Sequence, residues 1–383
     1  MSANEPQRIS IRQLLMVMVK QDASDLYITS GMAPSYRINN VVKPLRQEPL
    51  NGVQTEQLAN SCMSEKQRTA FAIDMEMNLA LAYEGMGRFR VNIFRQRGDV
   101  GMVIRKITTE VPTVDDLGLP EVFKEIVMNK RGLVIMVGAT SSGKSTSLAA
   151  MLDYRNRNQA GHIITVEDPI EFVHQHRKSV VTQREVGTDT VSFQAALKNT
   201  LRQAPDVILV GEIRDRETME HALEFAETGH LCMATLHANN ANQALERVMN
   251  FFPEELHPQV RLNLAMNMKA ILSQRLVKTP EGGRKAAIEI LINTPRIADL
   301  IEKWKIGEIK EAMAAGKNYH MQTFDQCLLE LWRDGYVSEE EALIQADALN
   351  DLRLKMKMAR LESSGDSSGS IDNLTDSRSE LKI

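Results

Sequence analysis

The segment Gly138–Thr146 constrains the fold more than any other feature of the sequence. It reads GATSSGKST and matches the pattern G-x-x-x-x-G-K-[S/T] at every fixed position. The apolar run Leu133–Val137 leads into it, and a segment rich in alanine and leucine, Ser147–Tyr154, follows it. A strand, a glycine-rich turn and a helix in this order form a phosphate-binding loop, because backbone N–H groups and the helix N-terminus converge on an anion. The alternative is that a loop rich in glycine and serine matches the pattern by chance, and the flanking strand and helix argue against this alternative.

This loop predicts ATP and Mg²⁺ as the bound cofactors. We expect Lys144 to reach the β- and γ-phosphates and Ser145 to ligate Mg²⁺. Glycines let the backbone curl closely around the anion. The nine predicted nucleotide-binding positions are Gly138, Ala139, Thr140, Ser141, Ser142, Gly143, Lys144, Ser145 and Thr146.

Two apolar runs end in acidic residues. Val207–Val210 is followed by Gly211 and Glu212, and Ile164–Val166 is followed by Glu167 and Asp168. Parallel strands deliver such residues to the carboxyl edge of the sheet, where ligands bind. Because Gly211 occupies the usual aspartate position, Glu212 is predicted to contact the metal or water alone, and Glu167 or Glu212 to orient the attacking water. The alternative for each acid is a helix cap or a solvated loop residue.

Histidines and arginines supply further candidates. His230 and His237 flank the apolar run Leu231–Leu236, and we expect them to sense the γ-phosphate, although a single histidine is more often structural. Arg88, Arg90, Arg95, Arg97 and Arg105 cluster near the start of the chain. They form either a solvated strand face or a set of arginines that reach phosphates across a subunit boundary, which requires a ring.

The pattern of apolar residues divides the chain. Residues 1–109 are predicted to form a small α/β domain with an antiparallel sheet, and 110–120 a proline-containing linker or, alternatively, a surface loop. From 121 to 361, apolar runs alternate with helices, which indicates a doubly wound α/β domain with a parallel sheet. Within it, residues 258–277 are predicted to be helical, and one helix with a capping box is predicted from Ser338 through Met356. Residues 362–383 have the composition of a disordered tail.

Composition excludes some classes of protein. Lys and Arg total 46 and Asp and Glu 50, so the formal net charge of −4 argues against a protein that coats nucleic acid. The cysteines, Cys62, Cys232 and Cys327, are far apart and are predicted to be reduced thiols. No secretory signal is visible, and no apolar run approaches the ~20 residues of a spanning helix. We therefore expect a cytoplasmic protein that meets the membrane only through partners.

Several blocks together resemble one family, the ATPases of type II secretion and type IV pili, and most closely its PilT/PilU retraction branch. The resemblance covers about residues 5–345 and includes the phosphate loop. The other matching blocks, in the family's order, are Ser24–Leu26, Arg88–Asn92, Thr165–His174, Gln183–Gly187, Leu209–Asp215, Glu227–Leu231 and Thr235–His237.

The resemblance implies a PAS-like N-terminal domain, a RecA-like P-loop ATPase domain and a homohexamer. It also implies ATP between the two domains, with Arg88, Arg90 and Arg105 reaching the phosphates. Glu167 would belong to the family's acidic box, Glu212 would be the Walker B acid, and His230 and His237 the histidine box. The ring would act on an inner-membrane pilus platform protein at the cytoplasmic face of the inner membrane, and would drive pilus retraction and twitching motility.

Two absences favour retraction over extension or type II secretion: a four-cysteine zinc insertion and a long extra N-terminal region. Departures from the family pattern occur at Ala139, Ser141, Ala204 and 296–302, and the last of these favours the PilU members. The alternatives are a motor that acts alone or assists a paralogous PilT ring, a weakly hydrolysing accessory ring, and an extension or secretion ATPase. A ring that moves on DNA is disfavoured because basic and aromatic residues are not interleaved.

Overall fold

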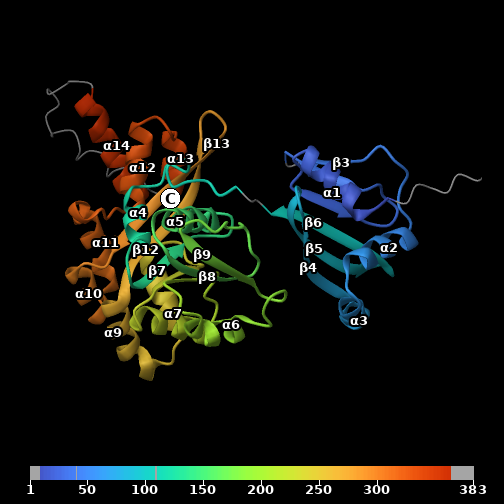
Figure 1. Cartoon of the computed structure of the whole chain (residues 1–383). Coiled ribbons are helices and arrows are strands. Elements are labelled where there is room, and N and C mark those ends of the chain that lie inside the picture. The colour runs from blue at the N-terminus through green and yellow to red at the C-terminus, as the bar shows by residue number, and fades with distance from the viewer. Residues whose placement is uncertain (1–8, 40, 108–109, 364–383) are drawn as a thin grey trace, which may run out of the picture.

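The computed structural model describes residues 9–39, 41–107 and 110–363, and the chain folds into two parts (Figure 1). The first part holds one sheet with helices against it. The second, larger part holds another sheet with helices on both faces. The predicted tail, residues 362–383, lies outside the described residues except for the end of the last helix, which reaches Ser363.

The N-terminal part is built on an antiparallel sheet, as predicted. Its first helix begins after Ser10, whose side chain accepts from the backbone N–H of Gln13 while the Gln13 side chain accepts from Ser10 in return. The six strands lie in the order β3-β2-β1-β6-β5-β4. The elements are α1 (Ile11–Lys20), β1 (Asp25–Ile28), β2 (Ser35–Ile38), β3 (Val41–Pro44), α2 (Gly52–Cys62), α3 (Glu65–Asp74), β4 (Glu76–Tyr83), β5 (Gly87–Gln96) and β6 (Asp99–Ile107).

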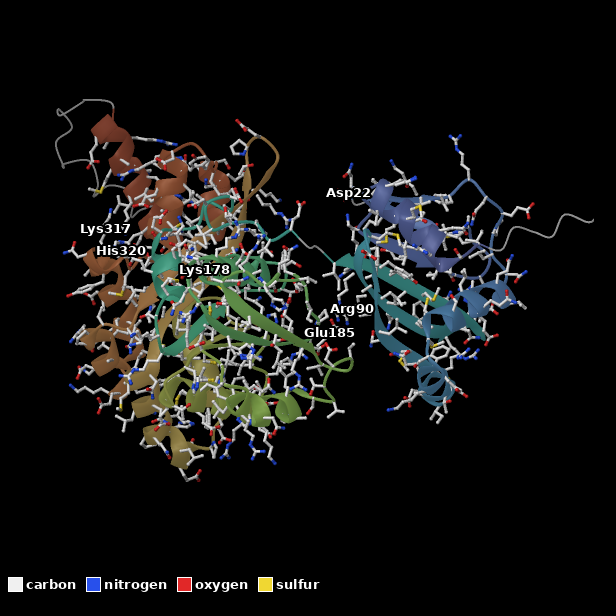
Figure 2. The ribbon with its side chains drawn as sticks, in the orientation of Figure 1. Asp22, Arg90, Lys178, Glu185, Lys317 and His320 are labelled. Carbon is white, nitrogen blue, oxygen red and sulfur yellow. The ribbon has the colours of Figure 1, made fainter. Side chains whose placement is uncertain are left out.

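Strand β5 shows how this sheet divides its two faces. Phe89, Val91 and Ile93 are fully buried in a core shared with α1, α2 and α3. Side chains alternate along a strand, so Arg88 and Arg90 lie on the opposite face. That face is turned toward the second part of the chain. Figure 2 labels Arg90 on this face and Glu185 on the second part opposite it. The helices and the arginines thus occupy opposite faces of one sheet.

The second part contains a seven-stranded sheet in the order β13-β12-β7-β11-β10-β8-β9. Strands β7 to β12 pair in parallel, and β13 adds an antiparallel edge. The predicted parallel sheet is confirmed, and the strands at 207–210 and 231–236 have the predicted bounds. The strands are β7 (Gly132–Val137), β8 (Gly161–Glu167), β9 (Ser179–Glu185), β10 (Val207–Val210), β11 (Leu231–Leu236), β12 (Met268–Thr279) and β13 (Gly283–Ile292).

Two hydrophobic cores lie on the two faces of this sheet. Leu133, Ile135 and Val137 of β7 face one core, and Val134 and Met136 face the other. This arrangement is the doubly wound architecture that the apolar runs predicted. The helices are α4 (Val122–Val127), α5 (Lys144–Asn158), α6 (Phe193–Thr200), α7 (Arg216–Glu227), α8 (Ala241–Asn250), α9 (His257–Asn267), α10 (Pro295–Glu302), α11 (Ile306–Ala315), α12 (Phe324–Arg333), α13 (Glu339–Gln345) and α14 (Leu349–Ser363).

Two predictions of helices were wrong. Residues 258–277 are not one helix: α9 ends at Asn267, and β12 begins at Met268 because it pairs with both β7 and β13. The helix predicted from Ser338 is divided into α13 and α14. Ser338 accepts from the backbone N–H of Glu341, but the Glu341 side chain accepts from Lys278 and Gln345 instead of closing the capping box.

The segment predicted as a linker contacts the second part of the chain. Val114 and Leu119 are buried in the core that also contains Phe123 of α4. The three cysteines are buried and form no disulfide, as predicted. Among the described residues, the structure contains no helix that combines the length and apolar character needed to cross a bilayer.

Candidate nucleotide site

The phosphate loop joins β7 to α5 at the carboxyl edge of the sheet. Gly138 has φ 154° and Gly143 has φ 88°, and a Cβ atom on either would approach other atoms to 2.4 Å and 2.7 Å. No larger residue therefore fits at these two positions. Lys144, buried at the start of α5, donates from Nζ to the carbonyl oxygens of Gly138 and Ala139, each at 2.8 Å.

Lys144 faces acidic residues across one pocket. This pocket is lined by residues of the loop, of the strand ends and of the segment after β8, and it contains three of the four predicted acids and histidines: Glu167, Glu212 and His237. Burial lowers the pKa of Lys144, and the nearby carboxylates of Glu212 and Glu171 oppose that shift. The strand-end acids predicted from the sequence therefore lie beside the loop.

The Glu212 carboxylate is held between His237 and Arg214. It lies 3.1 Å from His237 Nε2 and 2.7 Å from Arg214 Nε. Gly211, where an aspartate is usual, lies close to β8: a Cβ atom there would be 3.0 Å from the carbonyl oxygen of Val166. The glycine lets Glu167 and Glu212 approach each other at the sheet edge.

Glu167 has the chemistry of a general base. Thr165 Oγ1 donates to its carboxylate at 2.6 Å and Gln183 Nε2 at 3.2 Å. Burial raises the pKa of Glu167 to about 7, with the Glu171 carboxylate adding to the shift and the two hydrogen bonds opposing it. A base works best when its pKa is near the pH of the reaction.

His230 does not join this pocket. It lies before β11 at the amino edge of the sheet, and its Nδ1 is near Thr228 Oγ1 and the carbonyl oxygen of Phe225. His237 follows the same strand at the carboxyl edge, so the six residues of β11 separate the two histidines by ~20 Å. Within one chain, His237 lines the pocket beside the phosphate loop and His230 does not.

The arginine positions predicted from the sequence lie on the N-terminal sheet. Arg88 Nη2 is 3.8 Å from Glu185 at the end of β9, so this face meets the same edge of the second sheet that carries the pocket. Arg90 and Arg105 lie directly opposite each other on β5 and β6. Arg95 and Arg97 lie at the far end of the same hairpin, away from this pair.

Gln274 of β12 supports the loop from behind, and the sequence motif did not indicate it. The buried Gln274 Oε1 accepts from Ser147 Oγ at 2.7 Å, and Nε2 donates to the carbonyl oxygen of Ser142 at 2.9 Å. Gln183 has a similar role for the segment after β8, since it also contacts Phe172 and His174. Only the tertiary pairing of strands brings these glutamines to the site.

We expect Gln274→Leu to weaken ADP binding at least tenfold, because the carbonyl oxygen of Ser142 and the hydroxyl of Ser147 lose their buried partner and the loop loses its support. Each buried polar group left without a partner costs ~1–3 kcal/mol. Equilibrium titration with a fluorescent ADP analogue measures this. Gln322→Leu is the matched control, since Gln322 donates to Ile288 far from the loop. Equal affinity in wild type and Gln274→Leu would show that the contact does not support binding.

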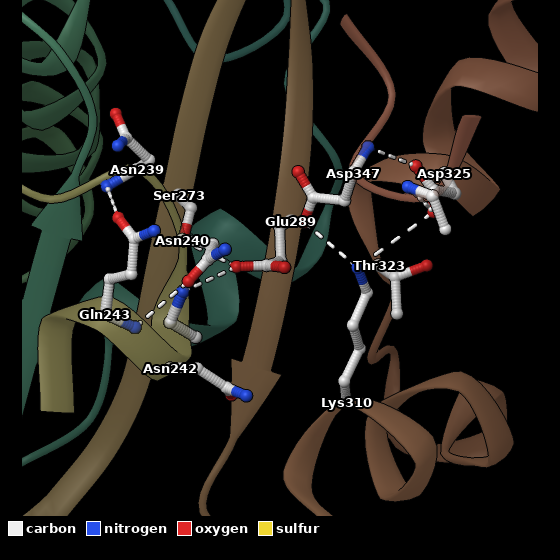
Figure 3. Close-up of polar contacts among 12 residues, drawn as sticks. Asn239, Asn240, Asn242, Gln243, Ser273, Glu289, Lys310, Thr323, Asp325 and Asp347 are labelled. Atoms are coloured by element: carbon white, nitrogen blue, oxygen red, sulfur yellow. Dashed lines mark hydrogen bonds and ion pairs between the residues drawn. The ribbon is translucent and has the colours of Figure 1, made fainter. Parts of the chain in front are cut away.

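A polar network supports the segment after His237 (Figure 3). Glu289 Oε1 accepts from the backbone N–H of Ala241 at 2.7 Å and from Ser273 Oγ at 2.9 Å. Lys310 Nζ lies 3.1 Å from Asp347, whose backbone N–H donates to Asp325. Burial raises the pKa of Glu289, and its hydrogen bonds oppose the shift. The first group of contacts joins the start of α8 to β12 and β13, and the second joins α11 to Asp347 and to Asp325 of α12.

The residues present fit a magnesium nucleotide. His174 lines the pocket, and its buried Nδ1 has no hydrogen-bond partner within the described ranges, which suits a polar contact to a ligand. Ser145 and Glu212 line the pocket and supply the oxygen ligands that Mg²⁺ prefers. No cluster of three or more metal-binding side chains occurs among the described residues, and a Mg²⁺ ion shared with phosphates does not need one.

Comparison with known proteins identifies the family. Residues 2–332 match the family described as Type II/IV secretion system protein. The chain belongs to this family. A type IV pilus ATPase, PilU of Pseudomonas aeruginosa, is 56% identical over 351 residues, which are 91% of this chain and 92% of that protein. The PilT retraction ATPase of the same organism is 44% identical over 334 residues, which are 87% and 97% of the two chains.

A solved structure supports the same assignment for this secretion-family member. The crystal structure of the pilus retraction motor PilT with bound ADP superposes with a TM-score of 0.85 at 40% identity, and covers 90% of this chain and 99% of that chain. The predicted resemblance to the PilT/PilU branch is confirmed, with the higher identity to the PilU relative. The chain is an ATPase of the secretion family, as the phosphate loop indicated.

Proposed function

We propose that this chain is the ATP-hydrolysing subunit of a homohexameric motor for type IV pilus retraction. The observation that carries the proposal is the pocket in which Lys144 faces Glu167, Glu212 and His237, within a fold shared with an ADP-bound retraction motor. Its N-terminal domain would be PAS-like and its ATPase domain RecA-like. It would act at the cytoplasmic face of the inner membrane, through a pilus platform protein and without nucleic acid.

Each group in the pocket has a distinct task. Lys144 and the loop N–H groups neutralise phosphate charge, and Ser145 and Glu212 would hold Mg²⁺, which would stabilise charge on the phosphates. Glu167 accepts the proton of the attacking water. His237, held by Glu212, donates toward the γ-phosphate. These groups of one chain already lie together at one sheet edge.

The arginine face completes the pocket. Arg90 and Arg105 are directly opposite on neighbouring strands, and like charges in such a pair are unfavourable. Arg88 adds a third positive charge on the same face. An anion between them removes the repulsion, so the phosphates of ATP suit this face. In the hexamer we propose that these arginines reach the nucleotide across a subunit boundary.

Retraction in cells tests the proposal. Strains lacking this chain are expected to lose or slow pilus retraction and twitching, and Lys144→Ala is expected not to restore them, whereas the exposed-lysine control Lys178→Ala restores them. Retraction of labelled pili and twitching zones are the measurements. Normal retraction supported by Lys144→Ala would contradict a motor that depends on hydrolysis by this chain.

A second candidate is an accessory ring that hydrolyses ATP weakly and assists a paralogous PilT ring. Ser141 favours it, because this loop residue has φ 63°, a conformation that costs a non-glycine residue ~1 kcal/mol or more. Steady-state ATPase of the purified chain separates the two: the autonomous motor shows Lys144-dependent turnover, and the accessory ring gains it only with the paralogous ring. Deleting the paralog in the same cells provides the matching test of retraction.

A further inference from the structure

We infer that Asp25 is a positioning residue that holds the Arg105 side chain toward the nucleotide phosphates. The inference rests on the proposed role of the arginine face. Asp25 lies on β1, and its backbone pairs with Arg105 of β6 on one side and with Arg37 of β2 on the other. Arg105 in turn pairs with Arg90 of β5. Residues paired in this way share one face of a sheet, so these four form one row across it.

The contacts of Asp25 are unlike those of an ordinary surface ion pair. Its carboxylate is only 4% exposed, yet the Arg105 side chain that it contacts is 68% exposed. Arg105 Nε donates to Asp25 Oδ1 at 2.8 Å. The other carboxylate oxygen accepts from Ser24 Oγ at 2.9 Å and lies 3.3 Å from Arg37 Nε. A buried carboxylate with several partners has a fixed position, so it can fix an exposed arginine.

The atom through which Arg105 is anchored matters. A guanidinium group has five N–H donors in a rigid fork, and Asp25 engages the one on Nε. The two terminal nitrogens make no hydrogen bond within the described part of the chain, and they are the donors that bind a phosphate in a bidentate manner. Asp25 therefore limits the rotamers of Arg105 without using the end of the side chain.

The neighbouring arginine has a different anchor. Arg37 donates from Nε to Tyr27 Oη at 2.9 Å, and its guanidinium lies over the Tyr27 ring. Tyr27 thus provides Arg37 with a second partner, while Arg105 has Asp25 alone among the described side chains. Loss of the Asp25 charge should free Arg105 and increase its repulsion from Arg90.

Steady-state ATPase of the full-length protein tests the inference. Asp25→Asn is expected to lower kcat about tenfold with KM changed less than twofold, because a preorganised arginine acts on the transition state. In an Arg105→Ala background, Asp25→Asn should add less than a twofold effect, since contacting residues that act together are not additive. The control is Asp22→Asn, which removes an exposed ion pair with Lys106, the next residue on β6, and should leave kcat within twofold.

Folding and assembly are followed in parallel by thermal unfolding and oligomer mass. If Asp25→Asn fails to assemble, Asp25→Glu keeps the charge, moves the carboxylate by one methylene and should lower kcat about threefold. The inference would be overturned if Asp25→Asn and Asp25→Glu both had the wild-type kcat. It would also be overturned if the double variant lowered kcat by the product of the Asp25→Asn and Arg105→Ala effects. If Arg105→Ala itself hydrolyses ATP at the wild-type rate, the proposed arginine face fails first, which distinguishes the two failures.

Discussion

Glu167→Gln is expected to slow ATP hydrolysis about 10²- to 10⁴-fold while nucleotide binding changes little, because glutamine keeps the shape of the side chain but cannot accept a proton. The raised pKa of Glu167 predicts a second result, in the pH dependence of the wild-type rate. The wild-type rate should rise with pH through about 7, where Glu167 ionises, and then level off. The pH dependence of kcat, measured beside nucleotide affinity, tests both statements.

One further variant and one stability measurement make this test specific. Thr165→Val removes a hydrogen bond that lowers the pKa of Glu167, so the rise in rate should move to higher pH. The folded-state pKa lies above the ordinary value, so ionisation opposes folding and stability falls as pH rises from about 4.5 through 7. Glu167→Gln should therefore unfold no more easily than wild type at pH 8. A wild-type rate for this variant would transfer the role of base to Glu212.

Arg105→Ala is expected to lower kcat about 10³-fold, the lower end of what an arginine that stabilises phosphate charge contributes. The Arg105 guanidinium is exposed and is repelled by Arg90, and the buried Asp25 keeps Arg37 and Ser24 as partners when Arg105 is removed. Arg105→Ala should therefore impair folding little. Arg46→Ala, an exposed arginine between β3 and α2, is the matched control. Steady-state ATPase at saturating ATP is the measurement.

Mixed rings decide which chain supplies the arginine. Rings assembled from Lys144→Ala and Arg105→Ala subunits should regain activity if Arg105 acts across a boundary, because some boundaries then combine both intact side chains. No chain carries both intact groups, so inactive mixed rings would assign the arginine to its own chain. Arg88, which lies 3.8 Å from Glu185 of the same chain, gives the structural reason for testing both arrangements.

The parts of the site that were predicted correctly are those whose residues are adjacent in the sequence. The loop, the strand before it and the acids after β8 and β10 are local patterns, and the structure brings Glu167, Glu212 and His237 beside Lys144. His230 shows the limit of this reasoning. His230 and His237 flank β11, and the two ends of a strand lie at opposite edges of the sheet. Two histidines that are close in the sequence are therefore far apart in the fold.

Groups that depend on tertiary pairing could not be predicted. Gln274 lies 127 residues from Ser147, and β12, which carries it, has a run of apolar residues that also suits a buried helix. Asp25 and Arg105 are 80 residues apart. Their contact follows from the strand order of the first sheet, which places β6 beside β1, and no local pattern specifies that order.

The position of Gln274 bears on how a minimal catalytic fragment is chosen. A fragment ending after β11 retains every residue of the nucleotide motifs through His237, but it lacks β12. The Ser142 carbonyl and the Ser147 hydroxyl then lose their partner, and the edge of β7 loses its neighbour. A fragment chosen by motif boundaries alone would therefore contain the phosphate loop but lack β12 and Gln274, which support it.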